Sequence, residues 1–437
     1  MRTPWIACYF LEVALQAKKR VIIVGGGFGG INAAKTLQKC KDLEITILDQ
    51  RNHHLFQPLL YQVAMAGLSP AEIACPIRSL FRKKNNVSVF LAKVTEIDLK
   101  QKKVKTAAGD FPFDYCVLAC GANSSYFGNT DWEPYAPGLK TIEQATEMRR
   151  RVLMAFERAE STRDREEQRY YLTFVVVGGG PTGVELAGAI GEISKFTLDK
   201  DFRNIDPGRT RIILIEAGDR ILQSFDPKLS RKACRALEKL GVQVWTSSKV
   251  SKISKDGVVV GDEFLRAKTV LWAAGVGPSE LSSSIECPKD RQGRIKVEPD
   301  LSLPGHSDIF CIGDQAHTLD RDQKPLPGLA PVAIQQGRYV GKLIIDDLKG
   351  KDRQPFQYWD KGQLATIGRK SAVMQVGNFK SFGFFAWLVW LFVHIFYLIG
   401  FRNRMAVFWQ WAWHYVSYAR GARLIIHKSW RMFDKKD

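Results

Sequence analysis

Two stretches of the sequence follow the same order of elements: an apolar, β-branched run, a glycine-rich turn, and a helical pattern that starts at once. They span residues 20–39 and 173–195. In a GxGxxG turn the first glycine permits the tight bend, the second lets a pyrophosphate approach the backbone, and the third packs helix against strand. Each stretch therefore predicts a βαβ dinucleotide-binding unit. The glycines are Gly25, Gly27 and Gly30 in the first unit, and Gly178, Gly180 and Gly183 in the second.

The strand that follows each turn ends in an acidic residue. Strand 44–49 ends in Asp49, and strand 211–216 ends in Glu216, which comes later in its unit because of a polar insert at 199–210. A carboxylate there accepts hydrogen bonds from ribose hydroxyls and repels a 2′-phosphate, so Glu216 favours NADH over NADPH. Two such sites imply two dinucleotides, and the usual pair is a resident FAD and a nicotinamide dinucleotide that donates hydride.

Periodicity and turn residues place further elements. The charged stretch 149–167 predicts a surface helix at a domain junction, and 229–240 predicts a helix that Gly241 ends. An Asp-Gly pair at 256–257 predicts a hairpin, and another helix begins near Pro331. The alternation of strand and helix patterns predicts the α/β class.

Composition limits the partners. The chain is 45% hydrophobic and 25% charged, which is typical of a folded globular protein. Its formal net charge of +19 favours an anionic partner: a phosphate-rich cofactor, a nucleic acid or an acidic membrane. The basic residues follow an aromatic tail and no RNA-binding motif is present, which argues against nucleic acid.

The eight cysteines form no CxxC pair and show no metal-ligand spacing with the seven histidines. We therefore expect neither a disulfide framework nor a metal site. Cys116 and Cys120 lie in an apolar run and are interpreted as buried structural thiols.

Four segments together resemble one flavoprotein family, the type II NADH:quinone oxidoreductases. They lie at 49–64, 178–188, 201–207 and 328–337, and the resemblance covers nearly everything from Lys18 onward. It implies a fold like glutathione reductase, in which an inserted NADH domain splits the FAD domain. The expected division is an N-terminal extension (1–17), a first FAD-binding segment (18–140), the NADH domain (141–288), a second FAD-binding segment (289–350) and a membrane-anchoring, quinone-access region (351–437).

The resemblance also assigns site residues. Gly313-Asp314 corresponds to the second FAD fingerprint, and Glu185 corresponds to a glutamate that assists proton handling near the flavin. The family's quinone motif, Ala-Gln-x-Ala-x-Gln, has Pro331 in place of its first glutamine, which leaves Gln335 and Gln336 as the expected quinone contacts. The remaining expected residues are His54, Gln57, Gly121 and Ala333 for FAD, and Thr182, Ala274 and Gly275 for NADH.

The last section of the chain is aromatic and basic. Residues 382–401 contain one ionisable side chain, His394, and as one helix would be long enough to cross a bilayer. Trp387, Trp390, His394 and Tyr397 instead form a stripe at helical spacing, which predicts an amphipathic helix lying in one leaflet. The eight basic residues after Phe401 favour a peripheral protein on anionic headgroups, at the cytoplasmic face of a bacterial inner membrane. A homodimer interface is the competing interpretation, and a homodimer is expected.

These observations and the resemblance predict an FAD enzyme that passes two electrons from NADH to a membrane quinone, ubiquinone or menaquinone, without pumping protons. Two alternatives stay open. A sulfide:quinone oxidoreductase would need reactive cysteines at the flavin, and no obvious pair is present. A membrane-docked NADH sensor would use the same folds without turnover.

Overall fold

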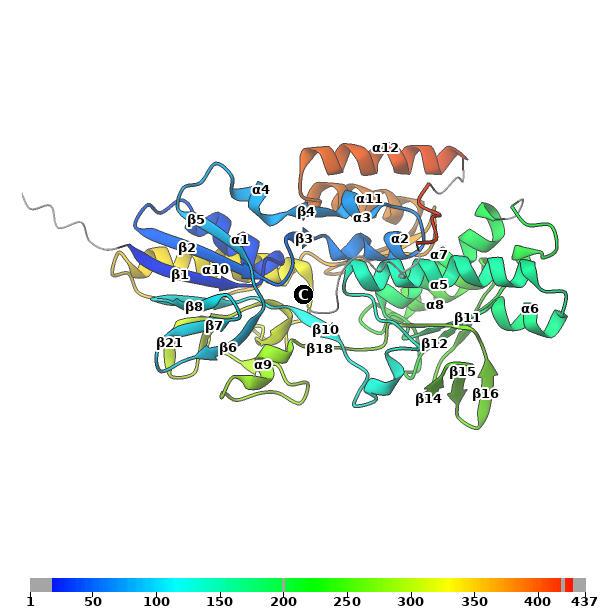
Figure 1. Cartoon of the computed structure of the whole chain (residues 1–437), viewed down its shortest axis with the longest axis horizontal. Helices are drawn as coiled ribbons and strands as arrows, with labels where there is room; N and C mark the ends of the chain where they lie inside the picture. Colours follow the sequence, from blue (N-terminus) through cyan, green and yellow to red (C-terminus); the bar gives the residue numbers. More distant parts are fainter. Residues whose placement is uncertain (1–17, 199–200, 418–420, 427–437) are drawn as a thin grey trace, which may run out of the picture.

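The computed structural model describes residues 18–198, 201–417 and 421–426, so the predicted extension at 1–17 lies outside the described residues. Figure 1 shows two α/β bodies side by side, with helices α11 (Phe384–Tyr397) and α12 (Phe401–Ser417) together along one edge of the molecule. The two bodies are joined by an antiparallel pair of short strands, β10 (Ala122–Ser124) and β18 (Val276–Pro278).

The first body is built on a six-stranded sheet with the order β20-β21-β9-β1-β2-β5. All neighbours are parallel except β20 and β21. The strands are β1 (Lys19–Val24), β2 (Leu43–Asp49), β5 (Val87–Leu91), β9 (Tyr115–Leu118), β20 (Ser302–Leu303) and β21 (His306–Cys311). The sheet thus combines segments separated by the whole second body, which supports the predicted domain division; its boundaries stay a prediction.

Two helices pack closely against this sheet and each other: α1 (Phe28–Leu37) and α10 (Ala330–Asp347). A Cβ on Gly337 would lie 2.2 Å from the carbonyl oxygen of Gly29, so only glycine permits this approach. Helix α10 begins at Ala330, which confirms the helix predicted near Pro331.

The second body contains a parallel sheet with the order β13-β12-β11-β17. Its strands are β11 (Thr173–Val177), β12 (Arg211–Ile215), β13 (Val242–Trp245) and β17 (Thr269–Trp272). Helix α7 (Pro181–Glu192) continues as the π-helix η3 (Ile193–Thr197), and α8 (Pro227–Lys239) ends just before Gly241, whose φ of +85° ends the helix as predicted. Both Rossmann-like units, and with them the α/β class, are confirmed.

The predicted surface helix at 149–167 is wrong in its start and in its burial. Helix α5 runs from Ile142 to Ser161, and α6 from Arg165 to Tyr171. Thr141 caps α5 by accepting a hydrogen bond from the Gln144 N–H. The helix buries one apolar stripe in the core: Ala145, Met148, Val152, Phe156 and Ala159. The charged residues between these positions concealed the stripe.

Smaller elements complete the fold. Strands β14 (Val250–Ser254), β15 (Gly257–Val260) and β16 (Glu263–Arg266) form the predicted hairpin and its extension. The others are β3 (His53–Leu55), β4 (Ala74–Pro76), β6 (Val94–Asp98), β7 (Lys103–Thr106), β8 (Gly109–Pro112), β19 (Ile295–Lys296), β22 (Ala316–His317), α2 (Leu60–Ala64), α3 (Pro70–Ile73), α4 (Ile77–Phe81), α9 (Glu280–Ser284) and the 3₁₀ turns η1 (Gln57–Leu59), η2 (Thr130–Trp132), η4 (Pro207–Arg209) and η5 (Gly313–Gln315).

The C-terminal region differs from a single helix at 382–401. A three-stranded sheet comes first: β23 (Gln363–Thr366), β24 (Ala372–Val376) and β25 (Phe379–Gly383). Helix α11 ends at Tyr397, since Leu398 is extended with a ψ of 129°, and Gly400 then adopts a φ of +92° before α12 starts. Across residues 18–198, 201–417 and 421–426, no helix has the length and apolar character needed to cross a membrane.

The two sides of α11 differ in burial, while its role as an amphipathic helix in one membrane leaflet stays a prediction. Trp390 is only 2% exposed and belongs to the main core, while Trp387, His394 and Tyr397 are half-buried beside it. The opposite side of α11 exposes large apolar residues, namely Phe384, Phe385, Leu388, Phe392 and Phe396. A long run of exposed apolar side chains therefore lies along this edge of the molecule.

Candidate functional site

The first glycine turn connects β1 to α1. Gly25 has a φ of +104°, and a Cβ there would lie 2.3 Å from the Ala119 carbonyl oxygen. A Cβ on Gly30 would lie 1.9 Å from the Gly25 carbonyl oxygen, whereas Gly27 has nothing within 4 Å of its Cβ position. Two glycines are therefore needed by the fold, and Gly27 leaves its backbone open toward a ligand.

Asp49, at the end of β2, is tied to the same turn. Its carboxylate accepts hydrogen bonds from the backbone N–H groups of Gly26 at 2.6 Å and Arg51 at 2.7 Å. Burial raises the pKa of Asp49, and the two N–H groups act in the opposite direction. The acid thus holds the glycine loop and also faces the cavity described next.

A cavity of about 370 Å³ opens over this turn. It is lined by residues from both sequence segments of the first body and also by residues of the second body. Of the predicted FAD residues, those lining it are Gly25, Gly27, Asp49, Gln57, Gly121, Gly313, Asp314 and Ala333. The structure therefore brings together at one cavity residues from 25 to 333.

The cavity suits an extended dinucleotide such as FAD. The glycine turn and the α1 N-terminus supply backbone N–H groups for a pyrophosphate. The second fingerprint lines the same space: Gly313 has a φ of +75°, and the Asp314 carboxylate lies 4.0 Å from the Lys140 ammonium. The donor set and the spread of the lining residues therefore fit the group, and we name this space the dinucleotide cavity.

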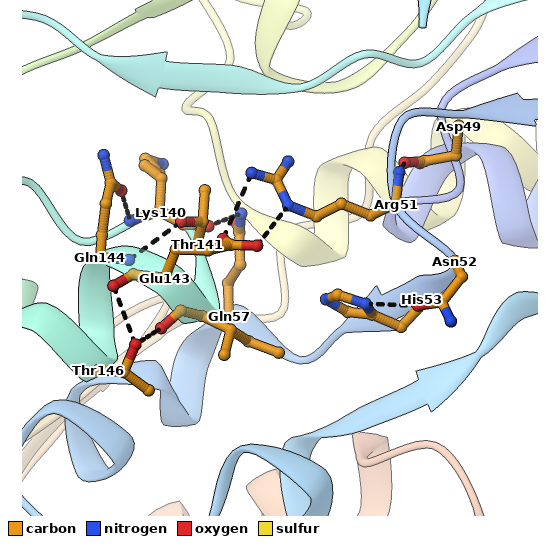
Figure 2. Close-up of polar contacts among 11 residues, drawn as sticks. Asp49, Arg51, Asn52, His53, Gln57, Lys140, Thr141, Glu143, Gln144 and Thr146 are labelled. Carbon is orange, nitrogen blue, oxygen red and sulfur yellow. Dashed lines mark hydrogen bonds and ion pairs between the residues drawn. The ribbon is translucent and has the colours of Figure 1, made fainter. Parts of the chain in front are cut away.

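Figure 2 shows polar contacts among residues of the loop after β2, of η1 and of the start of α5, several of which line this cavity. Arg51 and Glu143 form an ion pair at 3.4 Å that joins the loop after β2 to the first turn of α5. Gln57 donates to the Lys140 carbonyl oxygen at 3.2 Å. These contacts link the first body to the start of α5 and to the residue just before its cap.

His54, predicted to contact FAD, lies behind the glycine loop and not in the lining of the cavity. It is 1% exposed, its Nδ1 is 3.0 Å from the Gly26 carbonyl oxygen, and its ring packs edge-on against Phe28 at 5.0 Å. Burial lowers the pKa of His54 to about 4, so the imidazole is neutral at pH 7. In this geometry His54 supports the loop; its direct contact with FAD stays a prediction.

The second glycine turn repeats the first. Gly178 has a φ of +108°, and a Cβ on Gly183 would lie 1.8 Å from the Gly178 carbonyl oxygen, while Gly180 has an open Cβ position. Glu216 accepts from the N–H groups of Gly179 at 2.6 Å and Gly218 at 2.7 Å. The predicted NADH cradle therefore has the same construction as the FAD cradle.

Two of the predicted NADH residues reach the dinucleotide cavity, while the second glycine turn and Glu216 lie outside its lining. Thr182 and Gly275 line it, and Ala274 packs beside the Gly178 turn, where its backbone nitrogen would lie 2.6 Å from a Cβ on Gly178. A nicotinamide dinucleotide on the second turn would thus extend toward the same cavity that suits FAD.

Glu185 lies one helical turn beyond Thr182 but faces a different space. This second cavity, the aromatic cavity, has a volume of about 90 Å³ and lies between α2, α7, β23, α11 and α12. Its lining includes Tyr61, Trp387, Trp390 and Trp411. Burial raises the pKa of Glu185 to about 8, against the effect of a hydrogen bond from the Thr366 backbone. The carboxyl is thus poised to gain or lose a proton near neutral pH.

Gln335 and Gln336, predicted to contact quinone, both make hydrogen bonds within the protein. Gln335 pairs with the backbone N–H and carbonyl of Trp359, each at 3.0 Å. Gln336 is 1% exposed, accepts from the Gly313 N–H at 2.7 Å and donates to Thr318 Oγ1 at 3.0 Å. Neither lines the aromatic cavity. Gln336 fixes the second FAD fingerprint, and a quinone contact for either residue stays a prediction.

Sequence reasoning missed several lining residues. Arg51, His53 and Lys140 line the dinucleotide cavity, and Glu192 and Arg369 line the aromatic cavity. Glu185 and Glu192 are seven residues apart, a spacing that places both acids on one face of α7, and this signal was available. Arg369 comes from a distant hairpin, and no local pattern marks it.

Burial disfavours the thiolate form of the thiols near the site. Cys116 and Cys311 are buried, and burial raises the pKa of each well above its ordinary value. Cys120 lines the dinucleotide cavity, yet burial raises its pKa to about 12. The interpretation of Cys116 as a buried thiol is confirmed, whereas Cys120 is only partly buried.

Known proteins share this organisation. The pyridine nucleotide-disulphide oxidoreductase family matches residues 19–337, and the NDH2 C-terminal domain matches residues 360–417. The type II NADH:quinone oxidoreductase NdhA of Mycobacterium tuberculosis is 43% identical over 430 residues, covering 94% of this chain and 90% of that protein. The chain belongs to the type II NADH:quinone oxidoreductases.

A further relative and two solved structures of other proteins resemble this chain. The enzyme of Staphylococcus haemolyticus is 31% identical over 82% of this chain and 90% of that protein. The structure of NDH2 from Plasmodium falciparum in complex with NADH has a TM-score of 0.85 at 20% identity, covering 94% of this chain and 100% of that one. A sulfide:quinone oxidoreductase from Aquifex aeolicus has a TM-score of 0.71 at 19% identity, covering 89% and 92%. These two structures show the shared fold.

Proposed function

We propose that this type II oxidoreductase transfers two electrons from NADH through FAD to a membrane quinone. The observation that carries the proposal is the position of α7. Its N-terminus places Thr182 at the dinucleotide cavity, and its next turn places Glu185 in the aromatic cavity beneath α11 and α12. One helix therefore connects the dinucleotide cavity with the aromatic cavity, where we propose that the quinone ring binds.

FAD, when bound, accepts a hydride from NADH and passes the electron pair to an acceptor. The protein's own residues hold and orient the two dinucleotides. Gly27 and Gly180 expose backbone for the pyrophosphates, while Asp49 and Glu216 stand where ribose hydroxyls would bind. The hydrogen bond from Gly313 to Gln336 holds the second fingerprint in place.

Glu185 supplies a proton to the reduced acceptor. Reduction of a quinone consumes two electrons and two protons, and the hydride of NADH brings only one proton equivalent. With its pKa raised to about 8, Glu185 is protonated at neutral pH and borders the aromatic cavity. It can therefore donate there and recover its proton from solvent.

The test is spectroscopic. Purified protein should be yellow, lose its flavin absorbance on addition of NADH, and regain it when a quinone is added. A colourless protein that cannot be reconstituted with FAD would overturn the proposal. Bleaching by sulfide but not by NADH would assign the sulfide:quinone reaction instead, and bleaching without turnover would indicate a sensor.

We also propose peripheral attachment at the cytoplasmic face of a bacterial inner membrane, because NADH is produced in the cytoplasm. The exposed apolar side chains of α11 and α12 support this.

Deleting the chain after residue 379 would also remove β25 and the core residue Trp390, so Phe392→Gln with Phe396→Gln is the cleaner test. The double variant should lose binding to lipid vesicles and keep activity with a water-soluble quinone. Unchanged vesicle binding with a changed oligomeric state would identify this face as the interface of the expected homodimer.

A further inference from the structure

A groove that is distinct from both cavities, the basic groove, lies beside the aromatic cavity. It has a volume of about 590 Å³ and is formed by α7 and η3, by α8, and by the hairpin between β23 and β24. Five cationic side chains line it, Lys232, Arg235, Lys239, Arg369 and Lys370, against one carboxylate, Glu192. Neither the glycine cradles nor the proposed quinone chemistry uses it.

Three of these cations are arranged by α8. Lys232, Arg235 and Lys239 follow each other at intervals of three and four residues, so they project from one face of the helix. All three are exposed, and none forms an ion pair within the described residues. The Lys232 ammonium lies 5.6 Å from the centre of the Phe382 ring, which directs it toward β25.

One acid lines the groove among these five cations. Glu192 is 8% exposed, and its Oε1 accepts from the backbone N–H of Arg369. Its charge is therefore partly satisfied by a backbone donor within the protein. The groove presents a net positive charge built from ammonium and guanidinium groups, which together suit a phosphodiester.

The groove also borders the exposed apolar face of α11. Phe382 and Gly383 line it, and the next two residues, Phe384 and Phe385, are 51% and 57% exposed. Phe196 of η3, at the other side of the groove, is 50% exposed. Cationic groups therefore adjoin aromatic surface, which matches a molecule with a phosphate at one end and acyl chains at the other.

We infer that the basic groove binds the headgroup phosphate of an anionic phospholipid, while the lipid's chains lie along the aromatic surface of α11. Because Glu192 and Arg369 line both the basic groove and the aromatic cavity, the lipid would sit directly beside the proposed quinone site. This inference rests on the proposed membrane attachment and specifies its lipid selectivity.

The experiment compares two triple variants of the full chain. The groove variant is Lys232→Gln, Arg235→Gln and Lys239→Gln. The control variant, Lys249→Gln, Lys252→Gln and Lys255→Gln, removes the same charge from exposed positions in and beside β14, away from α11 and α12 (Figure 1). Binding is measured on vesicles of neutral phosphatidylcholine with and without about 30% phosphatidylglycerol, at about 0.1 M salt.

The wild type and the control variant should prefer the anionic vesicles, and the groove variant should lose roughly 100-fold of that preference, given the usual contribution of each cation near a membrane. Binding to neutral vesicles should be equal for all three. Lys232→Arg with Lys239→Arg should retain the preference. Equal losses in the two triple variants would overturn the inference, because net charge and not the groove would be responsible.

A competition experiment with free phosphate distinguishes a lipid headgroup from a soluble phosphate as the ligand of the basic groove. Inorganic phosphate at about 10 mM should leave anionic-vesicle binding intact, since it lacks the acyl chains and at this concentration adds little screening. Complete displacement by phosphate would assign the groove to a soluble anion and overturn the lipid. Flavin bleaching by NADH is recorded in parallel. If NADH does not bleach the flavin of the wild type, the proposed function is refuted, while the vesicle result remains valid.

Discussion

The two glycine turns are nearly identical in geometry and differ in what surrounds them. In each, an acid at the end of the next strand accepts from the N–H of the residue after the first motif glycine, Gly26 or Gly179, at 2.6 Å and from an N–H two residues beyond itself at 2.7 Å. Around Gly27, however, a cavity of about 370 Å³ is lined by segments from across the chain. The glycines of the second turn do not line it.

This difference suits the first turn to a ligand that stays bound and the second turn to a ligand that exchanges. A ligand on the first turn would contact the loops after β1 and β9 together with η5 and α10, and would leave only if many contacts broke together. A ligand on the second turn would contact that turn and Glu216 and would extend toward Thr182 and Gly275 at the edge of the second body. The first turn is thus suited to a resident cofactor and the second to a substrate that comes and goes.

The largest effects should come from alanine at the second glycine of each motif, Gly27 or Gly180, and the two variants should differ in which dinucleotide they lose. Gly27 has a φ of −75° and Gly180 of −69°, and neither Cβ position meets protein atoms within 4 Å. Gly27→Ala should therefore fold normally and lose FAD, because the new methyl group occupies the place of the pyrophosphate. Gly180→Ala should keep FAD and raise KM for NADH roughly 10- to 100-fold, the cost of a comparable steric overlap.

The flavin content of each purified variant and steady-state kinetics with NADH check this pair. Thermal unfolding of the FAD-free proteins serves as the control, and both variants should match the wild type. Loss of FAD from the Gly180 variant would show that the two turns do not serve separate dinucleotides.

The strands and turns of these units were predictable because their signal is local. Glycines that need positive φ or close approach, and apolar β-branched runs such as Thr173–Val177, carry that signal within a few residues. The start of α5 and the end of α11 were not predicted. The first depends on Thr141 as a cap ahead of a charged stretch, and the second on the extended Leu398 and on Gly400 within an apolar run.

Glu185→Gln tests a second difference between the two units, one turn further along the helix that follows each glycine turn. The equivalent position in α1 is Asn32, which bonds to Phe28 and Arg338, whereas Glu185 faces the aromatic cavity. Quinone reduction should fall roughly 100-fold in the variant, the lower range for a positioned proton donor. Bleaching of the flavin by NADH should be unchanged in stopped-flow measurements. An unchanged quinone rate would exclude Glu185 as the donor.

The pH dependence of this variant has a defined sign. Because the folded pKa of Glu185, about 8, lies above its ordinary value of 4.5, the folded protein holds a proton that the unfolded chain has released. Stability from this group is present below pH 4.5 and is lost as pH rises through 8. The wild type should therefore lose stability relative to Glu185→Gln between these values. Its quinone rate should fall above pH 8, a decline that the variant should lack.

The site itself was only partly predictable. The resemblance to a family pointed to Glu185, which lines a cavity, and the spacing of Asp49 and Glu216 from their glycines pointed to acids that bond to the two turns; the proton-donor and ribose roles stay predictions. The aromatic cavity depends on contacts distant in sequence, such as the Trp411 indole N–H donating to Gln62 at 2.7 Å. The hydrogen bonds that occupy Gln335 and Gln336 likewise depend on Trp359 and Gly313, which no pattern around the glutamines indicates.

Glu216→Arg tests the second turn alone. The substitution removes the repulsion against a 2′-phosphate and adds an attraction, so kcat/KM for NADPH relative to NADH should rise by about 10-fold or more. Because Glu216 also holds the N–H groups of Gly179 and Gly218, absolute activity should fall. Glu216→Gln is the control, since it retains acceptor geometry on one oxygen without the charge. An unchanged preference would refute the ribose assignment.

The smallest effect is expected where Arg51, which lines the dinucleotide cavity, pairs with Glu143 (Figure 2). Their side chains are 33% and 65% exposed, so the pair contributes at most about 1 kcal/mol, or roughly fivefold in a rate. Glu143→Gln should speed FAD dissociation by a few-fold at low salt and by nothing at about 1 M salt, where the wild type already behaves like the variant. Flavin fluorescence on dilution measures the rate. If the variant and wild type release FAD equally fast at low salt, the enclosure of the first turn comes from the cavity walls alone, and the contrast between the two turns is one of shape and not of charge.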